Sequence, residues 1–215
     1  MRVRLTEYRK SRRLTLQGWL VVAGCIAISG YVWFISIHDF LAVNKPVSAS
    51  VLVVEGYVPD FVLDSVANLW KNNPLLLIVC AGLPIKKGEF CCGYGSYADY
   101  NAAFLREKEI DSLQVIGAPA RPVDKDRTYT SALAAKDKLR ELGYESGKVD
   151  LVCLGTHARR SRLLYRKAFK SGWNIGVLSY PDNNYPEQWW KTSEGARAVV
   201  YEMFAYLYCI IFFRP

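Results

Sequence analysis

A chain of 215 residues with 51% hydrophobic residues is long enough for one domain and an additional apolar segment. Its formal net charge is +8, but residues 1–13 carry six basic side chains and one acidic one, so the other 202 residues contribute only +3. Neither a helix-turn-helix nor a zinc-finger or RNA-binding motif is present. Composition therefore argues against a nucleic-acid-binding protein, and we expect no nucleic-acid partner.

The basic tail, residues 1–13, is followed by an apolar segment, residues 14–37, without a charged side chain. At about 1.5 Å per residue, a helix of this length crosses a hydrocarbon core of roughly 30 Å. We therefore expect one transmembrane helix at 14–37, a linker at 38–48 and a folded domain at 49–215. The positive-inside rule predicts a cytoplasmic tail and an extracytoplasmic domain.

Two alternatives for this segment also export the domain. The segment resembles a cleaved signal peptide, although no small-residue cleavage site follows it. Val22-Ala23-Gly24-Cys25 resembles a bacterial lipobox, in which Cys25 would be lipidated.

Beyond the linker, short apolar runs alternate with segments of helical periodicity. Nearly continuous apolar strands are typical of a parallel sheet covered on both faces, so we expect an α/β fold with a three-layer, Rossmann-like parallel sheet of about five strands. Its last helix is expected to pack on the sheet and to touch the membrane interface with its end; a second span is the alternative. Strands are predicted at 50–54, 75–80, 113–116, 149–154 and 174–178, and helices at 61–70, 97–109, from Thr128 or Thr130 to 142, from the turn at 155–157 to 170, and at 187–213 with a break near Gly195.

Several polar or small residues follow the predicted strands. If the strand order is 3-2-1-4-5, it reverses between the first and fourth strands, where open α/β sheets bind ligands. Glu55-Gly56 after the first strand and Thr156-His157 after the fourth would then line one crevice, with Gly82 beside them. Glycine at these turns would allow the backbone to approach a ligand closely.

His157 is a candidate general acid or base, because its unperturbed pKa lies near neutrality. Glu55 is a candidate base, ribose contact or metal ligand, and a carboxylate that pairs with a neighbouring arginine is an equally good interpretation. We take these two residues as the candidate catalytic pair.

Arginines cluster just after this turn. Cations at a helix N-terminus oppose the helix dipole, so Arg159 and Arg160 call for an explanation other than helix stability. Together with the helix N-terminus and Thr156, they predict an anion site for phosphate or carboxylate. Arg127 and Thr128 precede or begin another helix and would complete the cluster.

The six cysteines show no metal-ligand spacing, and no metal site is predicted. Cys80 and Cys153 lie in predicted strands and are expected to be buried hydrophobic side chains. The adjacent Cys91 and Cys92 would be able to form a disulfide in an oxidising compartment.

Five segments resemble the bacterial ElyC/SanA/YdcF family. They are VLVVEGYVPD at 51–60, CAG at 80–82, DRTYTSA at 126–132, GTHARRSRLLYRKAF at 155–169 and WWKTSEG at 189–195. The resemblance implies a Rossmann-like domain on one N-terminal helix in the bacterial inner membrane. It also implies a role in cell-envelope integrity and in lipid-carrier or peptidoglycan metabolism; one member is linked to S-adenosylmethionine. No reaction is common to the family, so no cofactor is predicted.

The sequence thus predicts a membrane-anchored envelope protein that binds a phosphorylated ligand, lipid-linked or nucleotide-like, and acts on it. A non-catalytic ligand-binding module and a structural partner of envelope-biogenesis machinery are the alternatives.

Overall fold

A computed structural model describes residues 15–74, 76–86 and 93–215. The chain forms two compact units, Met1–Ile37 (unit 1) and His38–Pro215 (unit 2). Cys91 and Cys92, for which a disulfide was considered, lie outside the described residues.

Helix α1, Leu16–Leu41, supplies the described part of unit 1 and the first residues of unit 2. Its most apolar 18-residue window has a mean hydropathy of 2.2. Within the described ranges it is the one helix long and apolar enough to cross a membrane, in agreement with the span predicted at 14–37. The helix continues four residues beyond that prediction.

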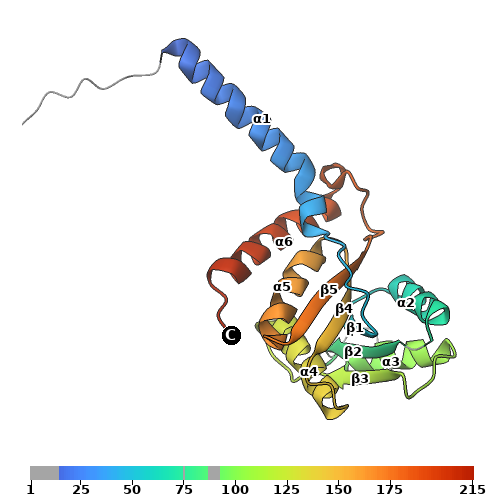
Figure 1. The fold of residues 1–215 in the computed structure, drawn as a ribbon. Helices are drawn as coiled ribbons and strands as arrows, with labels where there is room; N and C mark the ends of the chain where they lie inside the picture. Colours follow the sequence, from blue (N-terminus) through green and yellow to red (C-terminus); the bar gives the residue numbers. More distant parts are fainter. Residues whose placement is uncertain (1–14, 75, 87–92) are drawn as a thin grey trace, which may run out of the picture. The chain divides into compact units, whose positions relative to one another are not determined.

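The core of unit 2 is a five-stranded, entirely parallel sheet, as predicted. Its strand order is β3-β2-β1-β4-β5, so the order reverses between β1 and β4. Figure 1 shows the strands side by side. The strands are β1 Val51–Glu55, β2 Leu77–Gly82, β3 Val115–Pro119, β4 Gly147–Leu154 and β5 Trp173–Tyr180.

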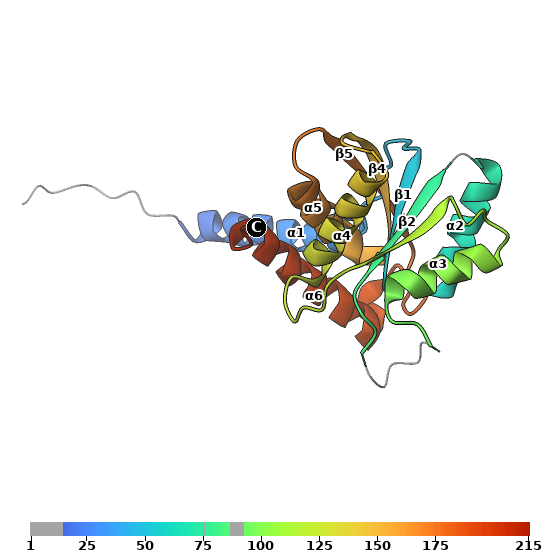
Figure 2. The same cartoon turned by 90° about the horizontal axis from the view of Figure 1, so that it is seen from below.

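Helices cover both faces of the sheet, and this explains why the strands are apolar throughout (Figures 1 and 2). Alternating strand side chains divide between two apolar clusters, one shared with α2 and α3 and the other with α4 and α5. Helix α6 packs mainly on α5 and not on the sheet, so the packing predicted for the last helix is wrong. The helices are α2 Asp60–Asn72, α3 Tyr97–Glu107, α4 Arg127–Glu141, α5 Ala158–Phe169 and α6 Ser193–Ile211, with short 3₁₀ turns η1 Gly155–His157 and η2 Trp189–Lys191.

The segment predicted as a linker, 38–48, is tied to the sheet. Lys45 pairs with Val177 of β5 through backbone hydrogen bonds. The buried Asp150 carboxylate accepts hydrogen bonds from the backbone N–H groups of Val47 and Ala49, at 2.7 and 2.9 Å. A buried carboxylate needs such donors, so Asp150 fixes the chain between α1 and β1.

Two predicted helix boundaries are wrong in detail. Helix α6 begins at Ser193 because the Thr192 hydroxyl accepts a hydrogen bond from the Gly195 N–H at 3.1 Å, so the break precedes Gly195. Helix α4 begins at Arg127, one residue before Thr128, the earlier of the two predicted starts. The Thr130 hydroxyl instead donates to the Asp126 carbonyl.

Candidate functional site

A pocket of about 1070 Å³ lies at the carboxyl ends of β1, β2 and β4, between the sheet and α6. This is the edge at which the strand order reverses, and where parallel α/β sheets bind ligands. Eight of the nine site residues predicted from the sequence line it: Glu55, Gly56, Gly82, Arg127, Thr128, Thr156, His157 and Arg160.

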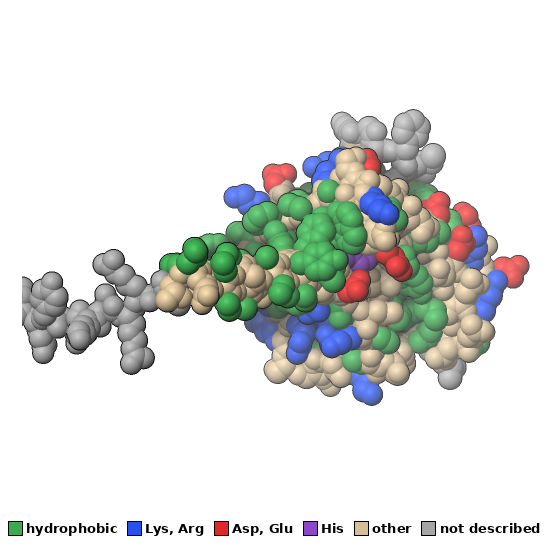
Figure 3. Space-filling model, turned by 90° about the horizontal axis from the view of Figure 1, so that it is seen from above, with side chains coloured by type: hydrophobic (Ala, Val, Ile, Leu, Met, Phe, Trp, Pro, Cys, Tyr) green, Lys and Arg blue, Asp and Glu red, His purple; other side chains and the backbone are tan. Residues whose placement is uncertain are grey.

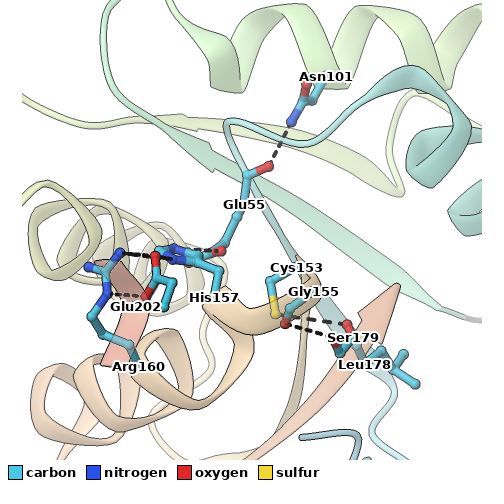
Figure 4. A network of polar contacts seen from close by, with 9 residues as sticks. All are labelled: Glu55, Asn101, Cys153, Gly155, His157, Arg160, Leu178, Ser179 and Glu202. Carbon is cyan, nitrogen blue, oxygen red and sulfur yellow. Dashed lines mark hydrogen bonds and ion pairs between the residues drawn. The ribbon is translucent and has the colours of Figure 1, made fainter. Parts of the chain in front are cut away.

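Strand β1 directs Glu55 toward α5 and α6. Alternate residues of a strand share one face, and Glu55 follows Val51 and Val53, which belong to the cluster packed on α4 and α5. The residue is only 8% exposed. Asn101 of α3 fixes the backbone at this point, because its side-chain N–H group donates to the Glu55 carbonyl at 3.0 Å (Figure 4). It also donates to the Gly56 carbonyl at 3.3 Å.

Gly56 and Gly82 bring two strand ends into contact. A Cβ on Gly56 would lie 2.7 Å from the Gly82 Cα and 2.9 Å from the Tyr97 Cβ. A Cβ on Gly82 would meet the same side-chain atom of Tyr97 at 2.8 Å. Both glycines therefore permit β1, β2 and α3 to pack closely, a structural role in addition to the ligand approach expected from the sequence.

His157 reaches the pocket from the turn after β4. Gly155 has φ of +48°, a left-handed conformation that favours glycine, and begins the η1 turn. Its carbonyl accepts a hydrogen bond from the Ser179 hydroxyl of β5 at 3.1 Å (Figure 4). The turn thus places His157 directly before α5.

Four side chains form a continuous polar network at the base of the pocket (Figure 4). His157 Nε2 lies 3.4 Å from Glu55 Oε2, and His157 Nδ1 lies 2.9 Å from Glu202 Oε1. Arg160 binds both oxygens of Glu202, through Nε at 2.7 Å and Nη2 at 2.9 Å. The histidine therefore bridges two carboxylates, one of which is held by a bidentate arginine.

The proton on Nδ1 determines which neighbour the imidazole binds. Nδ1 also lies 2.8 Å from Nη2 of Arg160, and a guanidinium is only a donor. A protonated Nδ1 donates to Glu202, whereas an unprotonated Nδ1 accepts from Arg160. In the first arrangement of the neutral ring, Nε2 is free to accept a proton on the side of Glu55.

The two carboxylates have opposite pKa shifts. Burial raises the pKa of Glu55, and this effect outweighs the opposing influence of His157. Burial would also raise the pKa of Glu202, but the hydrogen bonds from Arg160 and His157 lower it to about 2. Titratable groups whose surroundings separate their pKa values in this way are typical of acid–base sites.

The lining is richer in acids than the sequence suggested. Among the described residues that line the pocket, six are carboxylates and three are arginines. Arg160 is already paired with Glu202. The acids are Glu55, Asp124, Asp126, Asp182, Glu194 and Glu202, and the arginines are Arg127, Arg160 and Arg197.

Arg159 does not line the pocket, contrary to its predicted role in the anion site. Its guanidinium stacks on the Phe40 ring, 3.8 Å from the centroid, and Nε donates to the Phe40 carbonyl. Consecutive helix residues differ by about 100° in direction, so Arg159 and Arg160 cannot face the same site. Spacing within the sequence does not distinguish the two arginines, because the residues four positions later, Leu163 and Leu164, are both apolar.

Sequence reasoning missed Glu202 and Asn101. Glu202 is the sole charged residue in the apolar run 199–213, and a buried carboxylate in such a run requires a partner. That signal identifies an unusual residue but not its partners. Asn101 carries no comparable signal, because its role depends on the packing of α3 against the end of β1.

In the described part of the chain, no group of three or more His, Cys, Asp or Glu side chains has a metal-binding arrangement. Cys80 and Cys153 are buried, as predicted. Burial raises the pKa of Cys80 to about 12, so its thiol is unsuited to thiolate chemistry.

No protein-family model matches the chain, and no curated protein is significantly similar to it. The α/β fold is thus established by the structure, whereas the family resemblance stays a prediction.

Proposed function

We propose that the protein is a membrane-anchored enzyme of the bacterial cell envelope that acts on a phosphorylated ligand by acid–base chemistry. The observation that supports this most directly is His157 between Glu55 and Glu202, at the base of a large pocket at the sheet switch point. The resemblance to the ElyC/SanA/YdcF family supplies the envelope setting of the proposal.

In the proposed mechanism, Glu202 stays ionised and orients His157. A carboxylate that accepts the Nδ1 proton leaves Nε2 available to exchange a proton. Glu55, whose pKa is raised by burial, supplies or removes that proton. His157 and Glu55 would be the catalytic residues, since their reactive atoms face the pocket, and Glu202 and Arg160 would position the imidazole.

The phosphate group of the ligand would bind near the rim of the pocket. Arg127, Arg197 and the N-terminus of α4 line the pocket, and both arginines are exposed. N–H groups at a helix N-terminus favour an anion. The six carboxylates disfavour a polyanion, so a ligand with a single phosphate and a hydroxyl-rich or apolar remainder fits best.

Location follows from α1 and the basic tail. With α1 as a span, the positive-inside rule places residues 1–13 in the cytoplasm and unit 2 outside it. The pocket would then act on envelope components rather than on cytoplasmic metabolites.

The test uses the full chain in phospholipid nanodiscs with phosphomonoester and phosphodiester probes, including a polyprenyl phosphate. Replacing His157 by Gln should reduce turnover at least ~100-fold, the usual contribution of a general acid or base, with little change in probe affinity. Arg159→Ala is the matched control and should behave as wild type. Binding of a probe with turnover unaffected by His157→Gln would contradict the catalytic proposal and favour the binding module.

A further inference from the structure

Helix α6 carries an exposed apolar stripe on the side away from α5. Val200, Phe204, Leu207 and Ile211, which we call the outer stripe, are 44, 62, 43 and 58% exposed. Their spacing of four, three and four residues places them on one face of the helix. The run 199–213 contains no charged side chain except Glu202, which is buried against Arg160.

Aromatic residues border this stripe. Tyr201 and Tyr208 are exposed on α6, Phe212 is exposed directly after its last residue, and Trp190 is exposed in the preceding turn. Tyrosine and tryptophan are enriched at the interface between lipid and water, where an apolar ring and a polar atom are both accommodated. Figure 3 shows hydrophobic side chains gathered on one face of unit 2, with charged groups beside them.

Within unit 2, α6 contacts the last turn of α1, the end of the candidate span. Leu41, in the last turn of α1, is fully buried. The Phe40 ring lies 5.8 Å from the ring of Tyr206 on α6, and Arg159 covers Phe40. The segment that leaves the bilayer is therefore fixed to α6 itself rather than joined through a flexible linker.

From these three observations we infer that the outer stripe of α6 docks on the surface of the bilayer that anchors the chain. Exposed apolar faces of this kind mark interaction sites. The tether keeps α6 near lipid at all times, and the bordering aromatic residues suit the headgroup region, so lipid is the occupant rather than a second copy of the chain. The contact runs along the side of α6, whereas the sequence predicted contact through its end.

The inference is tested by photo-crosslinking of the full chain in nanodiscs of phosphatidylethanolamine and phosphatidylglycerol. A benzophenone amino acid replaces Phe204 in one variant and Leu207 in a second, so that a folding defect in one does not decide the result. The control replaces Leu113, which is 81% exposed and precedes β3, at the edge of the sheet opposite the pocket.

Both stripe variants should give at least ten times more lipid adduct than the Leu113 variant. Lipid adducts at the control level would overturn the inference. Crosslinks that join two protein chains in place of lipid would also overturn it and would assign the stripe to a dimer interface. The result does not depend on the proposed chemistry, because the crosslink is read without turnover.

Discussion

Two carboxylates reach the same histidine from different parts of the fold, and their surroundings differ. Glu55 extends from the end of β1 in a buried position, with its Oε2 atom 3.4 Å from Nε2 of His157. Glu202 extends from α6 and is bound through both oxygens by Arg160 as well as contacted by His157. Burial therefore raises the pKa of Glu55, whereas at Glu202 the same effect of burial is outweighed by Arg160 and His157 together, which lower its pKa.

This difference shows that burial alone does not determine the protonation of an acid. The side chains of Glu55 and Glu202 are 11 and 9% exposed, so they are nearly equally buried. What separates them is that Glu202 has hydrogen-bond contacts with both His157 and Arg160, and the Arg160 guanidinium reaches it from a position on α5 set by the helical phase of that element. Each prediction below alters one side of this comparison.

The largest effect is expected for Glu202→Gln. This change leaves the Arg160 guanidinium buried without its anionic partner, which costs about 3 kcal/mol of unfolding free energy. Denaturant unfolding of the full chain in detergent at pH 7 measures it. Adding Arg160→Met should recover part of the loss, whereas equal stability of Glu202→Gln and wild type would show that the pair contributes nothing.

The second-largest effect is expected on acidification, because protonation of Glu202 should destabilise the wild-type protein. Its pKa falls from 4.5 in the unfolded chain to about 2 in the folded state, so its contribution is complete above pH 4.5 and is lost as pH decreases toward about 2. Thermal unfolding between pH 6 and 3 should show a steeper loss for wild type than for Glu202→Gln. Parallel curves for the two proteins would contradict the assignment.

Glu55→Gln should stabilise the protein at high pH, whereas Glu202→Gln should destabilise it. The folded-state pKa of Glu55 is raised, so the folded protein disfavours ionisation of this carboxyl and loses stability relative to the amide as pH rises above 4.5. We expect a higher Tm than wild type at pH 8, no difference below pH 4.5, and loss of turnover. A lower Tm at pH 8 would mean that ionised Glu55 is stabilised in the folded protein.

The smallest effect is expected for Arg159→Ala. The cation–π contact of Arg159 with the ring of Phe40 contributes about 0.5–1 kcal/mol to the free energy of unfolding. The Arg159 side chain does not line the pocket. Unfolding should shift by no more than this amount, and probe binding should be unchanged. Weaker phosphate binding by Arg159→Ala would show that Arg159 belongs to the anion site, as the sequence predicted.

The sequence predicted the architecture well because the relevant signals are local. Apolar runs alternating with helical periodicity specify a parallel sheet, and residues that follow strands gather at one edge. Glu55 and His157 were found in this way. The apolar segment after a basic tail likewise predicted α1, which the structure describes as Leu16–Leu41.

Tertiary packing decided what those residues do. Glu202 lies 45 residues from His157 in the chain, and its contact depends on how α6 is rotated against α5, which no local pattern encodes. The same packing turned Arg160 inward to a carboxylate and Arg159 outward to Phe40. The local pattern of apolar and polar residues thus determined which groups reach the switch point of the sheet. The long-range packing of helices determined the charge of those groups, because a pKa depends on neighbours that only the fold brings together.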